Sequence, residues 1–361
     1  MKKIIVFLIC LLILPKVQAI STSATSAILM DQDSKRILYS NNIHDVRSVA
    51  SISKIMTAIL AVESGKLDEV VTIGDEINSA YGSAIYIQKD EEMTLRDLVY
   101  GLMLRSGNDA AASIATYVGG DMENFVKMMN EKAKEIGMKN TTFNNPSGLD
   151  EDKGNYSTAY DMAILTSYAM QNETYREIVK TKKHTVKTNK NVYSWTNKNK
   201  LLSSYKYTTG GKTGYTEIAR RTLVSTASKD GLNLVVVTLN DGNDFLDHKN
   251  LYEYAFENYT SYSILKEGDI NIYDETYYKN EQLYIKSNFK YPLLGSEKDS
   301  IKLKFELEKK TEFNENDSIG KVKVFIGTKQ IYEDDVFVKE KQIPKKSSIL
   351  KKIINWFKNL W

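Results

Sequence analysis

A serine and a lysine three residues apart, Ser51 and Lys54, have the types and the spacing for nucleophilic catalysis. They stand at the start of a predicted helix that continues to Glu63, and residues three apart on a helix face the same side. A serine hydroxyl is a weak nucleophile until a base takes its proton. Lys54 can be that base if burial or a nearby cation lowers its pKa, because only the neutral amine accepts a proton.

The Ser-x-x-Lys pattern by itself carries little information in a chain rich in both residues. It occurs five more times, at Ser203, Ser263, Ser287, Ser318 and Ser348. Only the pattern at Ser51 is followed first by Ser106-Gly107-Asn108 and then by Lys212-Thr213-Gly214. Lys-Thr-Gly occurs once in the chain, and the other Ser-x-Asn, at Ser40, lies upstream of Ser51. The ordered set therefore singles out Ser51 as the nucleophile.

This ordered set resembles the catalytic motifs of penicillin-binding proteins and class A β-lactamases. Longer segments are similar to the low-molecular-mass D-alanyl-D-alanine carboxypeptidases, over nearly the whole first domain. These segments are 49–58, 104–111, 143–149, 156–159 and 211–216. The resemblance implies a serine-type enzyme that removes the last D-alanine from peptidoglycan stem peptides, is inhibited by β-lactams and needs no metal or cofactor.

The resemblance assigns a role to each polar residue of the first two motifs. Ser51 attacks the carbonyl and Lys54 takes its proton. Ser106 relays a proton between Lys54 and the leaving amine. Asn108 binds the substrate amide, since its side chain has both a donor and an acceptor.

The third motif supplies the substrate-binding strand. Lys212 and Thr213 hold the substrate carboxylate, and Gly214 lets the substrate backbone approach the strand closely. The backbone N–H groups of Ser51 and Tyr215 form the oxyanion hole, which stabilises the charge that develops in acyl transfer.

One position departs from the family pattern. Many members continue Gly-Tyr-Thr with two residues and then Ala-Gly, whereas this chain has Arg220 in place of that glycine. Together with the upstream run Thr208-Thr209-Gly210-Gly211, this variant is similar to the sporulation-type branch. The resemblance implies action on spore cortex peptidoglycan.

Other chemistries fit the sequence less well. A class A β-lactamase uses an additional glutamate to activate the deacylating water, and the usual Glu-x-x-Leu-Asn segment is missing. A catalytically silent sensor of β-lactams or muropeptides remains an alternative. The three histidines, His44, His184 and His248, have no metal-ligand spacing, so we predict no metal site.

The N-terminal residues 1–19 have the three parts of a secretory signal. Lys2 and Lys3 precede an apolar run from Ile4 to Leu14, and small residues follow at 17–19. The run is about half of the ~20 residues that a membrane span needs, so a retained anchor is the weaker alternative. Cys10, the single cysteine, lies within this run, and the exported protein would carry no disulfide.

The periodicity of polar and apolar residues along the sequence predicts two domains. Residues 20–261 mix helical and strand patterns, as in an α/β (α+β) catalytic domain of the β-lactamase/transpeptidase type, with an antiparallel sheet flanked by helices. Residues 262–343 alternate with period two, for example over 301–307, which predicts a small β-sandwich-like domain.

A last segment, residues 347–361, predicts an amphipathic helix. Apolar residues recur on one face and lysines and asparagines on the other, so the helix suits the surface of a membrane and is too short to cross it. Packing of its apolar face on the β domain or on a partner is the alternative. We thus expect an exported protein held on the outer face of a membrane. The net charge of only +3 indicates no nucleic-acid partner.

Overall fold

The computed structural model describes residues 20–150, 154–272, 277–278, 281–310 and 317–339. The predicted signal segment and the predicted C-terminal helix lie outside these residues. The chain forms two compact units, one up to Asn258 and the other from Tyr259. The sequence had placed this boundary after residue 261.

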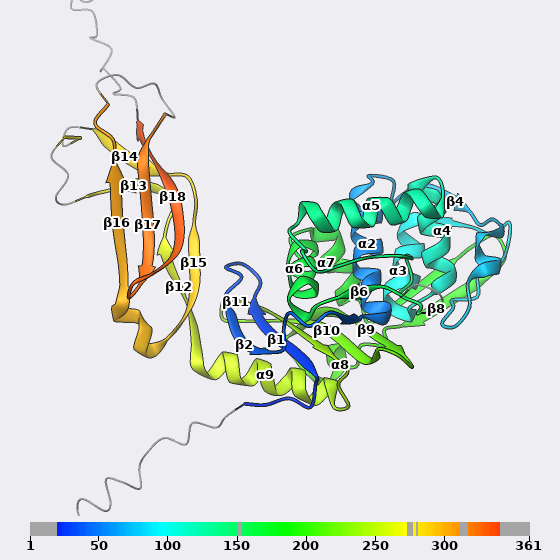
Figure 1. The fold of residues 1–361 in the computed structure, drawn as a ribbon. Helices are drawn as coiled ribbons and strands as arrows, with labels where there is room; N and C mark the ends of the chain where they lie inside the picture. Colours follow the sequence, from blue (N-terminus) through cyan, green and yellow to red (C-terminus); the bar gives the residue numbers. More distant parts are fainter. Residues whose placement is uncertain (1–19, 151–153, 273–276, 279–280, 311–316, 340–361) are drawn as a thin grey trace, which may run out of the picture. The chain divides into compact units, whose positions relative to one another are not determined.

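The first unit is built on a five-stranded antiparallel sheet (Figure 1). Its strands, in spatial order, are β2 (Ile37–Asn41), β1 (Ser26–Asp31), β11 (Leu232–Leu239), β10 (Arg220–Lys229) and β9 (Thr208–Thr216). The central strands β1 and β11 are apolar and buried almost throughout, because helices cover the sheet on both faces. Turns at Asp31–Ser34 and at Asp230-Gly231, whose residue types favour hairpins, join β1 to β2 and β10 to β11.

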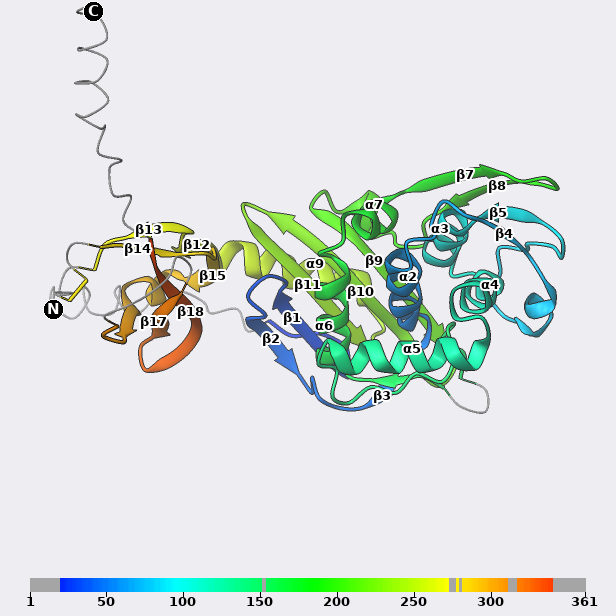
Figure 2. The ribbon, with the colours of Figure 1, turned by 90° about the horizontal axis from the view of Figure 1, so that it is seen from above.

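Helices cover one face of the sheet, as Figures 1 and 2 show. They are α2 (Lys54–Glu63), α3 (Leu95–Arg105), α4 (Asn108–Gly119), α5 (Met122–Glu135), α6 (Ala159–Ala169) and α7 (Glu173–Lys180). Helix α9 (Asp244–Asn258) lies on the opposite face. Every residue of α2 except Glu63 is buried, so this helix passes through the core of the unit.

Short elements connect these layers. They are η1 (Ala50–Ser53), η2 (Asp75–Ser79), α8 (Leu201–Ser204), and the strand pairs β3 (Arg47–Ser48) with β6 (Tyr156–Ser157), β4 (Val70–Thr72) with β5 (Glu92–Thr94), and β7 (Lys183–Lys187) with β8 (Val192–Thr196). Neither α7 nor the β7–β8 hairpin was predicted from the sequence. β7 has a single apolar residue, Val186, so the sequence of this hairpin shows little apolar alternation.

The second unit contains two antiparallel sheets. One has five strands, in the order β13 (Gly268–Ile270), β14 (Gln282–Ile285), β18 (Lys329–Lys339), β17 (Ser318–Ile326) and β16 (Ile301–Leu307). The other pairs β12 (Tyr259–Leu265) with β15 (Phe289–Leu294), and η3 (Gly295–Ser300) leads into β16. Both sheets contribute to one apolar core, which includes Leu283, Leu293 and Val336. The predicted fold class, a mixed catalytic domain followed by a β domain, is confirmed.

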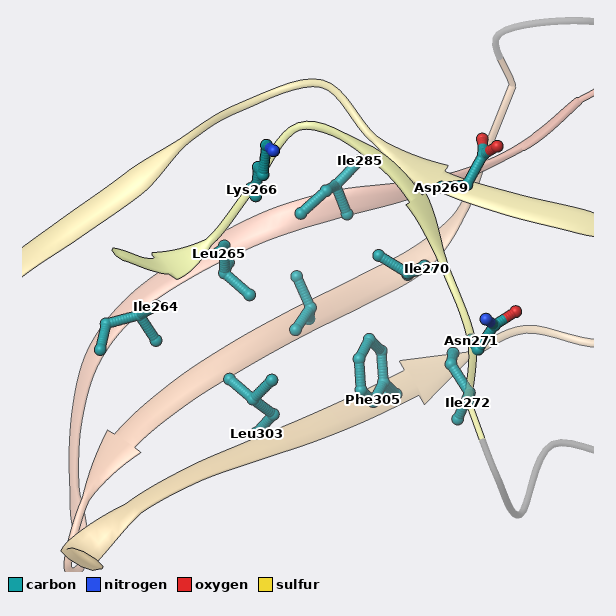
Figure 3. A pocket seen from close by; sticks show the side chains of 11 residues that line it. Ile264, Leu265, Lys266, Asp269, Ile270, Asn271, Ile272, Ile285, Leu303 and Phe305 are labelled. Carbon is teal, nitrogen blue, oxygen red and sulfur yellow. The ribbon is translucent and has the colours of Figure 1, made fainter. Parts of the chain in front are cut away.

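The second unit also has an apolar pocket of about 570 Å³, shown in Figure 3. Ile264, Ile285, Leu303 and Phe305 line it from three different strands. In the part of the chain that the structure describes, no helix has both the length and the apolar character needed to cross a membrane.

Candidate active site

The nucleophile pair lies where a short 3₁₀ turn passes into a buried helix. Ser51 belongs to η1 and Lys54 is the first residue of α2. The Lys54 Nζ is 3.1 Å from the Ser51 Oγ. The predicted contact between hydroxyl and amine is therefore present, and it follows from their spacing along the helix.

Three acceptors surround the Lys54 amine. Besides the Ser51 hydroxyl, the amine donates to Asn108 Oδ1 at 2.7 Å and to the Ser147 carbonyl. The Asn108 amide is oriented, because its Nδ2 donates to the Tyr81 carbonyl at 2.6 Å. Two directions around Nζ thus face oxygens that only accept, and a neutral amine would point its lone pair along the third, toward Ser51.

The surroundings favour the neutral form of this lysine. Lys54 is fully buried. Burial lowers its pKa well below the ordinary value, and the positive charges of Lys212 and Lys198 lower it further. In its neutral form the Lys54 amine has the chemistry of a general base.

The carbonyl that holds Lys54 comes from a loop at 144–149. Asn145 Oδ1 accepts from the Ser147 N–H at 3.1 Å and from the Gly148 N–H at 2.6 Å, so one side chain shapes the turn. Buried Asn155 fixes the loop in turn, accepting from the backbone of residues 144 and 145 at 2.7 and 3.1 Å. Gly148 has a φ of +81°, and a Cβ there would collide with the Ala50 carbonyl. Residue 148 must therefore be glycine, because its lack of a side chain lets the loop lie directly against η1, which carries Ser51.

The second motif lies at the junction of two helices. Ser106 follows α3 as its C-cap with a φ of 66°, and Asn108 begins α4. The same helix start also binds the loop that precedes it: the Asn108 N–H donates to the Ser83 carbonyl at 2.7 Å. The carboxylate of Asp109 accepts from the N–H groups of Ile85 and Tyr86 at 3.0 and 2.7 Å. The loop at 81–87 is therefore part of the site wall.

The third motif lies on β9, at the edge of the sheet. A Cβ on Gly214 would stand 3.0 Å from the Ser51 backbone nitrogen and would collide with Thr222 Oγ1. The strand thus passes directly beside the nucleophile. Lys212 is 1% exposed, and its Nζ donates to the Thr213 carbonyl at 2.7 Å. Burial lowers its pKa to about 7, with a smaller effect from Lys198.

A pocket of about 410 Å³ opens beside Ser51. Ser51, Ser106, Thr213, Gly214 and Tyr215 line it, so five of the eight residues predicted from sequence share one cavity wall. Lys54, Asn108 and Lys212 are buried.

Other residues of the site were missed by the sequence. Ser147 lies in the segment 143–149, which is similar to the family, but nothing in the sequence indicates that its carbonyl binds Lys54. The pocket is also lined by Lys198, Lys200, Arg221 and Asp244. None belongs to a motif, so only the sheet register and the loop path bring them to Ser51.

Comparison with known proteins places the chain in a family. Residues 15–243 match the family model described as D-alanyl-D-alanine carboxypeptidase. The chain belongs to the D-alanyl-D-alanine carboxypeptidase family. Residues 259–342 match the model of the penicillin-binding protein 5 C-terminal domain.

Individual members of the family agree with this assignment. D-alanyl-D-alanine carboxypeptidase DacF of Bacillus subtilis is 35% identical over 254 residues, covering 67% of this chain and 64% of DacF. For DacC of Escherichia coli the identity is 34%, covering 69% of this chain and 65% of DacC. The match thus spans just under two thirds of each relative. The crystal structure of penicillin binding protein 5 from Haemophilus influenzae superposes with a TM-score of 0.75 at 27% identity, over 90% of this chain and 98% of that one.

The departure from the family pattern has a structural counterpart. Arg220 begins β10 with a φ of 57°, in the left-handed region. Glycine enters this region without the steric penalty of a side chain. This carboxypeptidase-family chain makes the turn with a residue that carries a side chain and is therefore strained.

Proposed function

We propose that the protein is a serine-type D-alanyl-D-alanine carboxypeptidase that removes the terminal D-alanine from peptidoglycan stem pentapeptides. The observation that carries the proposal is the Lys54 amine, buried among the Ser51 hydroxyl, Asn108 Oδ1 and the Ser147 carbonyl. The family membership and the pocket beside Ser51 support it.

Acylation begins with the transfer of the Ser51 proton to Lys54. The Oγ then attacks the carbonyl of the penultimate D-alanine, whose oxygen lies between the N–H groups of Ser51 and Tyr215. The close approach of β9 at Gly214 to the Ser51 nitrogen supports this placement of the oxyanion hole.

Collapse of the tetrahedral intermediate breaks the peptide bond. The leaving amine takes a proton from Lys54 through the Ser106 hydroxyl, which lines the pocket together with Ser51. Water then hydrolyses the acyl-serine and regenerates the free enzyme. A shortened stem peptide can no longer donate in cross-linking, so the product is a less cross-linked wall. β-Lactams act as inhibitors because they acylate the same serine.

The test is D-alanine release from a pentapeptide, together with covalent labelling by fluorescent penicillin. Ser51→Ala should abolish both. Ser203→Ala is a matched control, since Ser203 begins another Ser-x-x-Lys pattern but is exposed at the surface. Labelling that persists in Ser51→Ala, or that is lost in Ser203→Ala, would refute the assignment.

The same assays separate the two alternatives. A β-lactamase would release the penicillin quickly and turn over a chromogenic cephalosporin, whereas a carboxypeptidase should hold the acyl group for longer. A silent sensor would be labelled by penicillin but would release no D-alanine. The intact arrangement around Lys54 supports turnover.

For the cellular location we propose export and attachment to the outer face of a membrane. Support comes from the sequence alone: the signal pattern over 1–19 and the amphipathic pattern over 347–361, to which Lys345 and Lys346 add positive charge. Full-length protein should bind anionic liposomes, and a chain that ends at Pro344 should lose binding and keep its activity. Equal binding by both would refute the anchor.

We also propose a role in spore cortex peptidoglycan, on the similarity of the Thr208–Gly211 run and of Arg220 to the sporulation-type branch. Deletion of the gene in a spore-forming host should raise cortex cross-linking. Muropeptides from wild-type and deletion spores that do not differ would contradict this role.

A further inference from the structure

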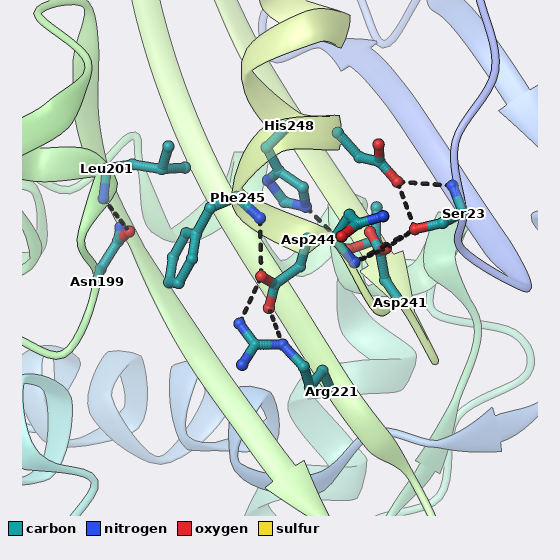
Figure 4. Close-up of polar contacts among 11 residues, drawn as sticks. Ser23, Asn199, Leu201, Arg221, Asp241, Asp244, Phe245 and His248 are labelled. Carbon is teal, nitrogen blue, oxygen red and sulfur yellow. Dashed lines mark hydrogen bonds and ion pairs between the residues drawn. The ribbon is translucent and has the colours of Figure 1, made fainter.

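An arginine outside every motif stands in the pocket beside Ser51. Arg221 is the second residue of β10, directly opposite Tyr215 of β9 in the register of the sheet. Its Nε and Nη2 donate to the two carboxylate oxygens of Asp244 at 3.1 and 2.6 Å, as Figure 4 shows. Such a two-point contact fixes the plane of the guanidinium.

The partner of this arginine is itself held in place. Asp244 begins α9, its side chain is 5% exposed, and it also accepts from the Phe245 N–H at 2.7 Å. The Arg221 guanidinium lies 5.6 Å from the centre of the Phe245 ring, which packs against it. The arginine is therefore preorganised on two sides before any ligand arrives.

The guanidinium still has hydrogen-bonding capacity. Among the described residues, no acceptor contacts the Arg221 Nη1, and the side chain is 46% exposed. Its free N–H groups are thus accessible from the pocket that Ser51 and Thr213 also line. A guanidinium with an open edge matches the geometry of a carboxylate.

The charge of the pocket points to an anionic ligand. Asp244 is neutralised by Arg221, and the two lysines of the wall, Lys198 and Lys200, form no ion pair within the described part of the chain. Lys212, assigned by sequence to the carboxylate, is buried, and its amine is directed to the Thr213 carbonyl. Arg221 is therefore better placed than Lys212 to bind an anion in the pocket directly.

We propose that Arg221, oriented by Asp244, binds the terminal carboxylate of the substrate and so restricts cleavage to the last peptide bond. This rests on the proposed carboxypeptidase function. Ser51 and Arg221 line the same pocket, so a carboxylate bound at Arg221 and a carbonyl attacked by Ser51 can belong to one substrate. A substrate peptide that continued past the terminal residue would have no carboxylate to place beside Arg221.

The experiment compares a pentapeptide ending in a free carboxylate with the same peptide ending in an amide. Arg221→Gln should lower kcat/KM for the carboxylate peptide by roughly 30- to 100-fold, the range expected for a lost hydrogen bond to a charged group. For the amide it should change kcat/KM less than about threefold, because that interaction is absent from the start. Arg220→Gln is the matched control, with the same charge change one residue away, and should behave as wild type on both.

Two further variants separate binding from a structural role. Asp244→Asn should raise KM for the carboxylate peptide by up to about tenfold with little change in kcat, since the arginine remains but is less well oriented. The double variant Arg221→Gln/Asp244→Asn leaves no unpaired buried charge. It should still lose the preference for the carboxylate. Recovery of that preference in the double variant would overturn the proposal, as would an equal loss on both peptides in Arg221→Gln.

The same comparison can be made without D-alanine release. Acylation by benzylpenicillin should fall in Arg221→Gln, while acylation by its methyl ester should not. Wild-type protein that acylates but releases no D-alanine would contradict the carboxypeptidase function and leave this test intact. Equal acylation of wild type and Arg221→Gln by benzylpenicillin would overturn the role of Arg221.

Discussion

The two units of the molecule differ in where their charged side chains lie. In the first unit, Lys54, Lys212 and His248 are each at most 1% exposed, and Asp244 is 3% exposed. In the second unit the ion pairs lie at the surface, for example Lys323 with Glu306 at 2.6 Å and Lys321 with Glu333 at 2.5 Å. All the buried polar and charged side chains of the described residues lie at or before His248.

The difference indicates which unit does the chemistry. Removing a charged group from water is costly unless it is paired or neutralised, so a small domain gains no stability from a buried lysine. The first unit has two such lysines. Lys54 contacts the Ser51 hydroxyl, and Lys212 belongs to β9, the strand that passes beside Ser51. The second unit has an alternating pattern with an apolar inner face and charged outer positions, which suffices for a stable β fold.

The largest effect should come from removing the buried base. Lys54→Met should lower the rate of acylation by fluorescent penicillin about 10³-fold or more, because no other group can take the Ser51 proton. Thermal unfolding should show equal or higher stability, since the desolvation cost of the amine disappears.

The matched change in the second unit is Lys321→Met, which removes an exposed lysine. It should leave acylation unchanged. A loss of activity as large as that of Lys54→Met would contradict the contrast between the units.

A smaller effect is expected where β9 passes the nucleophile. Gly214→Ala adds a methyl group against Ser51 and Thr222, and the displacement should lower kcat/KM about 10²-fold. Gly295→Ala in the second unit meets no atom within 4 Å and should have no effect on activity. Full activity of Gly214→Ala would show that the strand can move away without cost.

The pH dependence should reveal the two lysines as a coupled pair. Protonated Lys54 cannot accept the Ser51 proton, so the acylation rate should fall on the acid side. The positive charge of Lys212 lowers the pKa of Lys54, so Lys212→Met should raise that pKa and move the acid limb to higher pH. Stopped-flow acylation by penicillin from pH 5 to 9 measures the limb. A limb that stays in place or moves to lower pH would contradict the coupling.

The free energy of unfolding of the first unit should fall at acid pH because of His248. This ring is buried between Ser225 and Thr238, and burial lowers its pKa to about 3 from 6.5. Because the unfolded chain takes up the proton first, the His248 contribution is fully present above pH 6.5 and is lost as pH falls toward about 3, at up to about 1.4 kcal/mol per pH unit.

Chemical unfolding at several pH values measures this slope. The variant His248→Gln should flatten it over that window. In the second unit, Lys304 and Lys323 lower the pKa of Glu306 to about 2, so its contribution is lost only as pH falls from 4.5 toward 2. Since Glu306 is at the surface, added salt should weaken its contribution and not that of His248. Equal salt sensitivity in the two cases would contradict the contrast.

The smallest effect concerns two tight turns. Arg220 in the first unit has a φ of 57°, and Gly327, between β17 and β18 in the second, has a φ of +59° with open space around it. Arg220→Gly should stabilise the protein by up to about 1 kcal/mol, and Gly327→Arg should destabilise it by about 1 kcal/mol. Unfolding in denaturant would measure both. Changes of the same sign in the two variants would refute a conformational origin.

Much of the site was determined by sequence alone. The three-residue spacing from Ser51 to Lys54 fixes their contact, because it depends only on helical geometry. The order of the three motifs identified the family and, with it, the strand that carries Lys212 and Gly214. The hairpin at Asp230-Gly231 and the alternating strands of the second unit likewise follow from local conformational preferences.

The tertiary structure decided which groups surround these motifs. The carbonyl of Ser147 reaches Lys54 across 93 positions of the chain, and Asp244 reaches Arg221 across 23. A backbone carbonyl is the same in every residue, so no sequence pattern marks the one that will bind an amine. Burial is also a property of the whole packing, and it lowers the pKa of both Lys54 and Lys212. Local geometry therefore sets which residues meet along a helix or strand, while the sheet register and loop paths set their charge state and partners.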